Sequence, residues 1–370
     1  MPKAHPKYKH DMNFVIACGG TGGHLFPGLA VAEALKERGH DVLLFVSSKE
    51  IDRVALKDYP WLKAEKLSVT GMPGLLSPKI FGFVWRFFSS LCKCLQIYRG
   101  IRPACVLSMG GFTAAPPVLA GWMRGIPGVV HDSNAIPGKA NLLVARFSSK
   151  VALGLDVCKK FFPGKSVEIT GTPVRKSLKD TAQIALSDYG LTEGKKTILV
   201  MGGSQGAGGI NEAILRMLPL LGAEHPDQWQ FIHLTGPQDE QRAREAYQKA
   251  GVKAFVAAFS GQMGALYRLA DVAVSRSGAA SMTELSFFGI PTLFIPYPHA
   301  ADDHQRANAQ VFVGAGAALM LTQHEASGER VMGRLESLLE KHDEFSKNAR
   351  ALFIENAEVR VADVMEDLCR

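Results

Sequence analysis

The stretch Asp271-Val272-Ala273-Val274-Ser275-Arg276-Ser277-Gly278-Ala279-Ala280-Ser281-Met282-Thr283-Glu284 joins an apolar run, a turn of small residues and a helical pattern. We expect a buried strand over Asp271 to Val274 and a helix that opens between Ala279 and Ser281. The first backbone N–H groups of a helix have no partner within it, so they point toward an anion. The stretch therefore predicts a phosphate site, with Glu284 placed to accept hydrogen bonds from a ribose diol.

The spacing of Ser281 and Glu284 also allows a second interpretation. Ser-x-x-Glu is a capping box, in which the carboxylate only satisfies a backbone N–H at the start of the helix. The choice between the two interpretations depends on the rest of the chain.

Length and composition indicate a soluble protein of two domains. The chain has 370 residues, of which 47% are apolar and 21% charged, so it is neither disordered nor collagen-like. Six cysteines occur without a CxxC pair, which favours reduced thiols and argues against zinc. The tail from Met1 to Met12 lacks the apolar core of a secretory signal.

The net charge of +7 indicates an anionic partner, and nucleic acid, acidic lipid and a phosphorylated substrate all remain open.

The first half of the chain alternates strands and helices. An apolar run ends at Gly19-Gly20-Thr21-Gly22-Gly23-His24, Pro27 favours a helix start, and helical spacing continues until Gly39. This alternation predicts a parallel sheet that is covered on both faces. The expected strands are Asn13 to Cys18, Asp41 to Ser47, Ala104 to Met109 and Gly128 to His131, and the expected helix is Leu29 to Arg38.

The second half repeats the opening of the first. Lys196 to Met201 runs into Gly202-Gly203-Ser204-Gln205-Gly206-Ala207, and a helix is expected from Ile210 to Leu221. Further strands are expected at Gln230 to Leu234, Ala254 to Ala257, Asp271 to Val274 and Thr292 to Ile295. We therefore expect an α/β fold of two Rossmann-like domains that face a cleft. One comprises residues 1–174 with a C-terminal helix at about 355–370 packing back on it, and the other comprises residues 175–354.

The two glycine loops allow ligand binding or simple turn formation. Neither has the G-x-G-x-x-G spacing of a dinucleotide site or the Gly-Lys-Ser/Thr of a P-loop. Both follow strands, however, and ligands of open α/β sheets bind at the carboxyl ends of the strands. Two such loops are harder to explain as turns alone.

Several side chains near these loops have the chemistry of an active site. His24 is suited to proton transfer near neutral pH, although a histidine here also caps or packs a helix. Asn134 ends the polar run His131-Asp132-Ser133-Asn134 after another strand. Arg175 is expected at the domain junction. Its guanidinium either contacts a phosphate there or is only exposed to solvent.

A bound metal is not expected. No Asp-x-Asp occurs, so a sugar diphosphate has to be neutralised by cations and helix N-termini, each worth about 0.3–1 kcal/mol. The loops at Thr21, Ser204 and Ala279 supply such N–H groups. Asp302-Asp303-His304-Gln305 has metal-ligand residue types, but in one short loop we expect them to bind a sugar or to cap a helix beginning near Arg306.

The segment from Leu75 to Leu95 predicts an amphipathic helix with two apolar stripes. At about 100° per residue, one stripe packs inward and the other meets a membrane interface, with Lys79, Arg86 and Lys93 beside it. The alternative is a helix buried on most sides. The first stripe is Leu76, Ile80, Phe83, Phe87 and Leu91, and the second is Phe81, Trp85, Phe88 and Cys92.

The motifs, taken in order from about residue 13 to the C-terminus, resemble the bacterial glycosyltransferases of family 28 that form lipid II. They are Gly19 to Gly28, Gly110-Gly111-Phe112, His131 to Asn134, Gly171-Thr172-Pro173-Val174-Arg175, Gly202 to Ala207, Ser275 to Glu284, and Asp303-His304-Gln305 with Asn308-Ala309. The family usually has Glu-Gln where this chain has Asp132-Ser133.

The resemblance implies a GT-B fold and an inverting, metal-independent transfer with no cofactor. The implied donor is UDP-N-acetylglucosamine and the implied acceptor is lipid I, undecaprenyl-pyrophosphoryl-N-acetylmuramoyl-pentapeptide. The implied location is the cytoplasmic face of the inner membrane, with an anionic membrane surface and cell-envelope synthesis proteins as partners and no nucleic acid.

The resemblance also assigns roles to residues. It implies His24 as general base, Glu284 at the ribose and Ser260 at uracil through its backbone. Ala279, Ala280, Ser281, Met282 and Thr283 are implied to lie by the diphosphate, Ser204, Gln305 and Arg175 to contact the donor, and Thr21, Gly22, Gly23 and Asn134 to contact donor or acceptor.

Two other functions share this sequence pattern. A sugar-nucleotide 2-epimerase has the same architecture but consumes UDP-N-acetylglucosamine without a lipid. A membrane-bound scaffold for cell-envelope proteins would keep only a vestigial nucleotide site.

Overall fold

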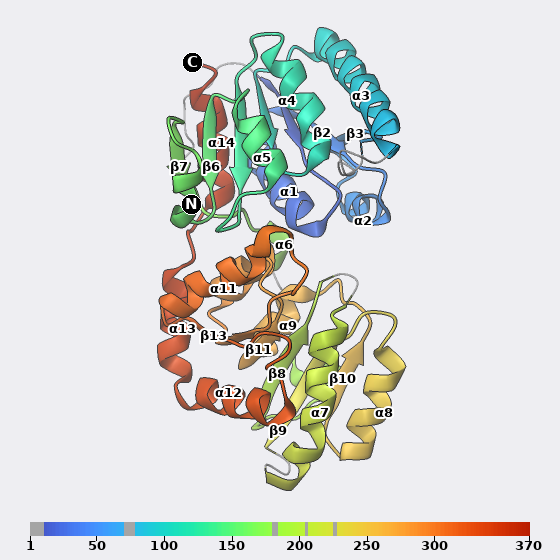
Figure 1. Cartoon of the computed structure of the whole chain (residues 1–370), viewed down its shortest axis with the longest axis vertical. Helices are drawn as coiled ribbons and strands as arrows, with labels where there is room; N and C mark the ends of the chain where they lie inside the picture. The colour runs from blue at the N-terminus through green and yellow to red at the C-terminus, as the bar shows by residue number, and fades with distance from the viewer. Residues whose placement is uncertain (1–10, 70–77, 180–183, 204–205, 225–227) are drawn as a thin grey trace. The chain divides into compact units, whose positions relative to one another are not determined.

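The computed structural model describes residues 11–69, 78–179, 184–203, 206–224 and 228–370 (Figure 1). The chain divides into two compact units, which we call unit 1 (Met1–Arg175 with Glu355–Arg370) and unit 2 (Lys176–Ile354). The division lies one residue after the boundary placed at residue 174, and the C-terminal segment belongs to unit 1.

Unit 1 is built on one parallel sheet with the order β3-β2-β1-β4-β5-β6-β7. The strand order reverses between β1 and β4. The elements are β1 (Asn13–Ala17), α1 (Gly22–Glu37), β2 (Asp41–Val46), α2 (Glu50–Ala55), η1 (Leu56–Asp58), β3 (Lys63–Lys66), α3 (Lys79–Ile101), β4 (Cys105–Ser108), η2 (Phe112–Ala114), α4 (Ala115–Trp122), β5 (Gly128–Asp132), α5 (Lys139–Ala145), β6 (Lys150–Leu153), η3 (Asp156–Phe161), β7 (Val167–Ile169) and α14 (Ala357–Asp367).

Both faces of the first sheet are covered. Alternate residues of β1 point to opposite faces, so Phe14 and Ile16 pack with α1 and α14, whereas Val15 and Ala17 pack with α3, α4 and α5. The central strands are buried throughout, as expected for a parallel sheet between two helical layers.

Unit 2 repeats this plan with the strand order β10-β9-β8-β11-β12-β13, again entirely parallel. The order reverses between β8 and β11. The elements are α6 (Lys176–Lys179), η4 (Leu186–Tyr189), β8 (Lys196–Met201), α7 (Gly208–Glu224), β9 (Trp229–Leu234), α8 (Glu240–Ala250), β10 (Ala254–Ala257), α9 (Met263–Leu269), β11 (Val272–Ser275), α10 (Ala279–Phe288), β12 (Thr292–Phe294), η5 (Ala301–Asp303), α11 (His304–Gly314), β13 (Ala318–Met320), α12 (Gly328–Glu340) and α13 (His342–Ala351).

The second sheet also lies between two helical layers. Helices α7, α8 and α12 pack on the face that bears Ile198 and Val200. Phe294 on β12 packs edge to face on Phe312 of α11, with ring centroids 5.8 Å apart. The expected pair of Rossmann-like folds is confirmed.

The first helix starts earlier than the pattern of residues 27–38 predicts. Helix α1 begins at Gly22, so Pro27 lies inside it. Pro27 has no N–H to donate to the carbonyl of Gly23, and its ring crowds that carbonyl, so the cost falls on a single hydrogen bond in the second turn of the helix. The strands not predicted are mostly edge or near-edge strands, which are short or polar and carry no strong apolar pattern: β3, β6, β7 and β13.

A buried cluster of charges holds α14 to unit 1. Glu366 is buried, and its two oxygens accept hydrogen bonds from Arg38 Nη1 at 2.6 Å and His40 Nε2 at 3.0 Å. His40 Nδ1 accepts the backbone N–H of Met12 at 3.4 Å, so Nε2 carries the hydrogen. Arg38 also pairs with the more exposed Asp363 at 2.9 Å.

Glu366→Ala should destabilise unit 1 by about 3–5 kcal/mol, because it leaves the charge of Arg38 without its buried partner. Asp363→Ala is the matched control on the same helix and the same arginine, and it should cost less than about 1 kcal/mol because that pair is exposed. Urea unfolding of the full chain measures both values. Equal losses in the two variants would contradict a special role for the buried pair.

Candidate functional site

The glycine loop after β1 requires glycine at its first two positions. Gly19 and Gly20 have φ values of +136° and +87°, which L side chains rarely adopt. A Cβ on Gly19 would lie 2.8 Å from the backbone nitrogen of Ser47. These constraints bring the loop close to the end of β2 and turn the chain into α1.

Asp52 fixes this loop through hydrogen bonds. No pattern in the sequence indicates this role. Its buried carboxylate accepts the N–H of Gly20 at 3.1 Å, and the N–H and hydroxyl of Ser47 at 2.9 and 2.5 Å. Lys49 Nζ donates to the carbonyl of Gly20 at 2.7 Å. The glycine loop is therefore fixed in position, while Gly22 and Gly23 begin α1 with N–H groups that lack intrahelical partners.

His24 lies in the first turn of α1, beside the loop that follows β4. Its Nδ1 is 3.2 Å from Thr21 Oγ1, and a Cβ on Gly110 would lie 2.9 Å from its Nε2. Glycine at position 110 therefore leaves room for the imidazole. For Nε2 to accept a proton, Nδ1 must carry the hydrogen and donate it to Thr21.

Asn134 is oriented by Asp132 at the end of β5. Asp132 Oδ1 accepts the N–H of Asn134 at 2.9 Å and its side-chain amide at 3.3 Å, and Oδ2 accepts from Asn141 at 2.8 Å. The neighbouring His131 is buried, which lowers the pKa of its imidazole, and its Nε2 donates to the carbonyl of Gly171 at 2.9 Å. The expected polar cluster at this edge of the sheet is present.

Arg175 stacks on an aromatic ring and has no ion pair among the described residues. Its guanidinium carbon lies 3.8 Å from the ring centroid of Phe26 on α1, a cation–π distance. Its Nε is buried and has no hydrogen-bond partner among the described residues. The cation is thus presented beside the helix that carries His24.

In unit 2, α10 begins at Ala279 as expected. Gly278 is the N-cap and contributes no side-chain hydrogen bond, so the N–H groups of Ala279, Ala280 and Ser281 are those that a helix leaves unpaired. Met282 donates its N–H to Gly278 at 3.0 Å and its side chain is buried. Thr283 Oγ1 donates to the carbonyl of Ala279 at 2.9 Å. Met282 and Thr283 therefore support the turn whose first three amides face outward.

Glu284 does not cap this helix, so the capping-box interpretation is wrong. The helix begins two residues before Ser281, and Tyr267 Oη donates a hydrogen bond to Glu284 Oε2 at 2.7 Å. Tyr267 is buried on α9 and stacks on Phe288 at 5.2 Å. No local pattern indicates Tyr267 as the partner of Glu284, because it lies 17 residues away on another helix.

Gln305 presents its amide nitrogen from the start of α11. Its Oε1 accepts the N–H of Tyr297 at 2.9 Å and its carbonyl accepts Ser277 Oγ at 2.8 Å. This links the α11 start to the loop before α10. Asp302 and Asp303 precede it with φ values of +51° and +52°, a strained pair of left-handed residues.

The expectation of a helix cap at Asp302-Asp303 is not met. Helix α11 begins at His304, two residues earlier than expected, and Asp303 makes no side-chain cap hydrogen bond. His304 Nδ1 instead lies 2.7 Å from the carbonyl of Ala301.

Within the described ranges, no group of three or more His, Cys, Asp or Glu residues is arranged to hold a metal ion.

Ser204 and Ser260 are the two remaining predicted site residues of unit 2. Ser204 lies outside the described residues. Ser260 follows β10, and its hydroxyl accepts the N–H of Gln262 at 3.1 Å. Gly206, at the end of the second glycine loop, has a φ of +80°, and a Cβ there would overlap the carbonyl of Thr235. The close approach of the loop to β9 therefore requires glycine at this position.

Helix α3 exposes a row of aromatic residues. Phe81, Trp85 and Phe88 are 80%, 77% and 57% exposed, while Leu91 and Tyr98 are buried against unit 1. The predicted division into an inward and an outward stripe is confirmed for the described residues, and Leu76 lies outside them. Lys93 pairs with Glu65 at 2.7 Å, so its charge is already balanced.

Helix α3 is also the one helix of the described chain that is long and apolar enough to cross a membrane, over Ile80–Ile101. Its C-terminal half is part of the folded unit, because Tyr98 Oη donates to the carbonyl of Pro117 at 3.1 Å.

Comparisons with known proteins agree with this geometry. Residues 14–153 match the glycosyltransferase family 28 N-terminal domain, and residues 197–368 match the family 28 C-terminal domain. Over 345 residues the chain is 37% identical to the UDP-N-acetylglucosamine–N-acetylmuramyl-(pentapeptide) pyrophosphoryl-undecaprenol N-acetylglucosamine transferase of Citrifermentans bemidjiense, a match that covers 92% of this chain and 95% of that relative.

Solved structures show the same architecture. The crystal structure of MurG from Acinetobacter baumannii is similar with a TM-score of 0.75 at 26% identity, covering 96% of this chain and 99% of that one. A UDP-GlcNAc 2-epimerase from Neisseria meningitidis, solved with UDP-GlcNAc bound, is similar with a TM-score of 0.67 at 16% identity, covering 96% and 100%. The second likeness shows the fold alone.

Proposed function

The chain belongs to glycosyltransferase family 28, and we propose that it transfers N-acetylglucosamine from UDP-N-acetylglucosamine to the 4-hydroxyl of N-acetylmuramoyl-pentapeptide pyrophosphoryl-undecaprenol. The product is lipid II, the precursor of peptidoglycan. The observation that carries the proposal is the similarity, along nearly the whole length of both proteins, to a relative named for this reaction. The fold is that of GT-B glycosyltransferases, with two parallel-sheet α/β units.

We assign the donor to the carboxyl edge of β8 and β11 in unit 2. The outward N–H groups of Ala279, Ala280 and Ser281 favour a diphosphate, since the helix dipole adds to their hydrogen bonds. Glu284, whose carboxylate is oriented by the hydrogen bond from Tyr267, accepts the ribose hydroxyls. Gln305 donates its amide to the sugar.

We further propose that the reaction needs no metal ion. The charge that develops on UDP is then met by the helix N-terminal amides and by Arg175, whose guanidinium is held on the ring of Phe26. Groups that are held in place before the reaction stabilise the leaving group without reorganising during it.

The acceptor hydroxyl is deprotonated by His24 in this proposal. The 4-hydroxyl oxygen attacks the anomeric carbon, the bond from that carbon to the diphosphate oxygen breaks, and its electron pair leaves with UDP. The proton goes to His24 Nε2, and Thr21 stabilises the resulting imidazolium through Nδ1. Attack from the face opposite the leaving group inverts the anomeric centre.

A 2-epimerase is the rival with the same fold. It is disfavoured because the epimerase structure resembles this chain in fold alone, whereas the transferase resembles it in sequence. The two also differ in what they need, since an epimerase consumes UDP-N-acetylglucosamine without an acceptor.

The function is tested by following labelled sugar from UDP-N-acetylglucosamine to a short-chain lipid I analogue, with EDTA present. We expect labelled disaccharide and one UDP released for each sugar transferred, both dependent on the lipid. Consumption of the donor without lipid would favour the epimerase. Loss of transfer in EDTA, restored by Mg²⁺, would overturn metal independence alone.

The lipid acceptor requires contact with a membrane, and we propose that α3 makes it at the cytoplasmic face. Exposed Phe81 and Trp85 suit the interface between head groups and acyl chains, where aromatic rings are favourable. Arg86 is exposed beside them and attracts anionic lipid, whereas Lys93 is paired with Glu65. Contacts with other cell-envelope synthesis proteins stay a prediction.

His24→Ala should lower kcat by about 10²–10⁴ while leaving the KM for UDP-N-acetylglucosamine nearly unchanged, because a general base acts on the acceptor. Thr21→Val keeps the volume but removes the hydroxyl that selects the tautomer, so we expect a smaller loss. Steady-state kinetics with the lipid I analogue measures both variants. An unaltered kcat in His24→Ala would remove this residue from the mechanism.

Tyr267→Phe should raise the KM for UDP-N-acetylglucosamine about tenfold at nearly constant kcat, since it removes one hydrogen bond to the Glu284 carboxylate but keeps the ring stacked on Phe288. The double variant with Glu284→Ala should bind no worse than Glu284→Ala alone. Additive losses would show that Tyr267 acts independently of Glu284.

Replacing Phe81 and Trp85 together by serine should weaken co-sedimentation with anionic vesicles by about tenfold or more, because two large apolar side chains leave the interface. Binding of the unaltered chain should decline with salt. Val359→Ser, on α14 at the opposite face of the same sheet, is the control. Equal binding by both variants would exclude α3 as the contact.

A further inference from the structure

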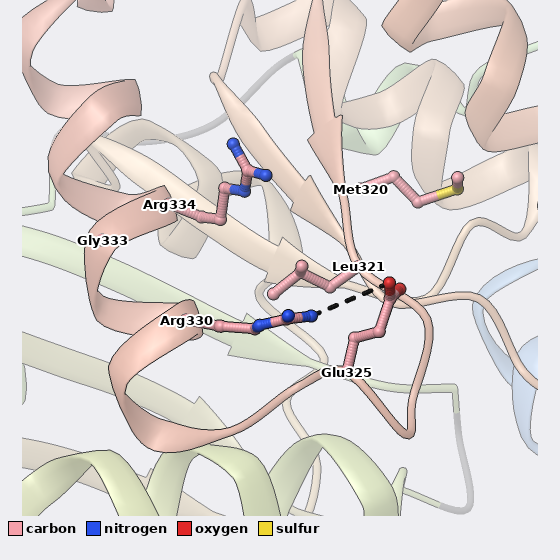
Figure 2. Close-up of a pocket in the computed structure, with 6 residues that line it drawn as sticks. All are labelled: Met320, Leu321, Glu325, Arg330, Gly333 and Arg334. Carbon is pink, nitrogen blue, oxygen red and sulfur yellow. Dashed lines mark ion pairs between the residues drawn. The ribbon is translucent and has the colours of Figure 1, made fainter.

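A cavity of about 440 Å³ lies in unit 2 between the end of β13 and the first turns of α12 (Figure 2). Met320 at the end of edge strand β13 lines one side, and the loop from Leu321 to Ser327 contributes Leu321 and Glu325. This size suits a small molecule. The lining residues are Met320, Leu321, Glu325, Arg330, Gly333 and Arg334. None of them belongs to the donor or acceptor machinery described above.

The cavity carries an excess of positive charge. Arg330 and Arg334 are one helical turn apart, on the same face of α12. Glu325 is held mainly by the backbone and hydroxyl of Thr322, whose hydrogen bonds lower the pKa of the carboxyl, and it lies 3.8 Å from Arg330 Nη1. Within the described residues Arg334 has neither an ion pair nor a hydrogen bond. One guanidinium therefore remains for an outside anion.

Gly333 leaves the space between the two arginines open. A glycine inside a helix costs about 0.5–1 kcal/mol relative to alanine, yet a Cβ here would approach nothing closer than Glu336 Oε2 at 4.0 Å. Packing within the unit therefore does not require the glycine. Figure 2 shows Arg330 directed toward Glu325 and Arg334 directed away from that pair, with Leu321 between them.

The wall of the cavity is bonded to the loop before α10. Gln323 Oε1 accepts Arg276 Nη2 at 2.7 Å, and Arg276 Nη1 donates to the carbonyls of Ile295 and Pro296 at 2.9 and 3.0 Å. Arg276 is buried and lies two residues before the N-cap Gly278. A shift of the Leu321 to Ser327 loop would therefore act on the position of the α10 N-terminus.

We propose that this cavity binds a small organic anion, with its carboxylate or phosphate on Arg334 and its apolar part on Met320 and Leu321. Its occupancy changes the affinity of unit 2 for the UDP-sugar through Gln323 and Arg276. This second step rests on the donor site proposed above, whereas the binding step does not.

Binding is tested by calorimetric titration of phenyl phosphate and of benzoate into the full chain with saturating UDP, which fills the donor site. Benzyl alcohol is the uncharged match. We expect binding of at least one anion, a Kd raised about tenfold or more in Arg334→Gln, and no change in Lys347→Gln, which removes an exposed cation on α13. Absence of binding by both anions, or equal Kd values in Arg334→Gln and the unaltered chain, would overturn the site.

Gly333→Leu separates binding from folding. It keeps both arginines and adds a good helix former, so the melting temperature should not fall, while the side chain fills the cavity and abolishes anion binding. Unchanged binding in this variant would contradict the proposed location.

The effect of the bound anion on donor affinity is measured as the KM for UDP-N-acetylglucosamine with and without the anion. We expect the anion to shift this KM in the unaltered chain and not in Gln323→Ala, which should still bind it. An unshifted KM alongside measurable binding would overturn the regulatory step and leave the site. A chain that binds the anion with UDP present but transfers no sugar would count against the proposed function instead.

Discussion

The structure depends on unpaired main-chain N–H groups at two helix N-termini, α1 in unit 1 and α10 in unit 2. Each helix follows a strand at which the order of a parallel sheet reverses, β1 beside β4 and β11 beside β8. At that point the neighbouring connections leave on opposite faces of the sheet, so the carboxyl edge stays open. Among the described residues these amides have no partner within their helix, and we propose an anion as their ligand.

Open amides are useful only if the backbone that carries them does not move. In unit 1 the buried Asp52 carboxylate holds the glycine loop, and in unit 2 Tyr267 holds the carboxylate that we assign to the ribose. Asp132 does the same for Asn134. In each case a group that we place at the ligand site is oriented by another group, and the orienting group is the more buried of the two.

Each unit also exposes one surface to which we assign a role. On unit 1, α3 buries its C-terminal half in the fold and presents aromatic rings from its N-terminal half, as a contact for a lipid acceptor requires. On unit 2, the α12 cavity shares a loop with the segment that precedes α10. In our proposals, the first surface contacts the membrane and the second binds a small anion that changes the affinity for the donor.

The sequence by itself determined the two parallel sheets, most central strands, the start of α10 and the family, because buried strands and glycine turns leave local patterns of apolar and small residues. It also indicated His24, Asn134, Gln305 and Glu284, which lie at the ends of such elements. Only the tertiary structure decided that Glu284 faces Tyr267 rather than the helix end, that Asp52 supports Gly20, and that Lys93 is neutralised by Glu65. Those pairings join residues 17 to 32 positions apart on different elements. A local pattern does not predict which side chains the fold brings together, because that depends on how each helix packs on its sheet.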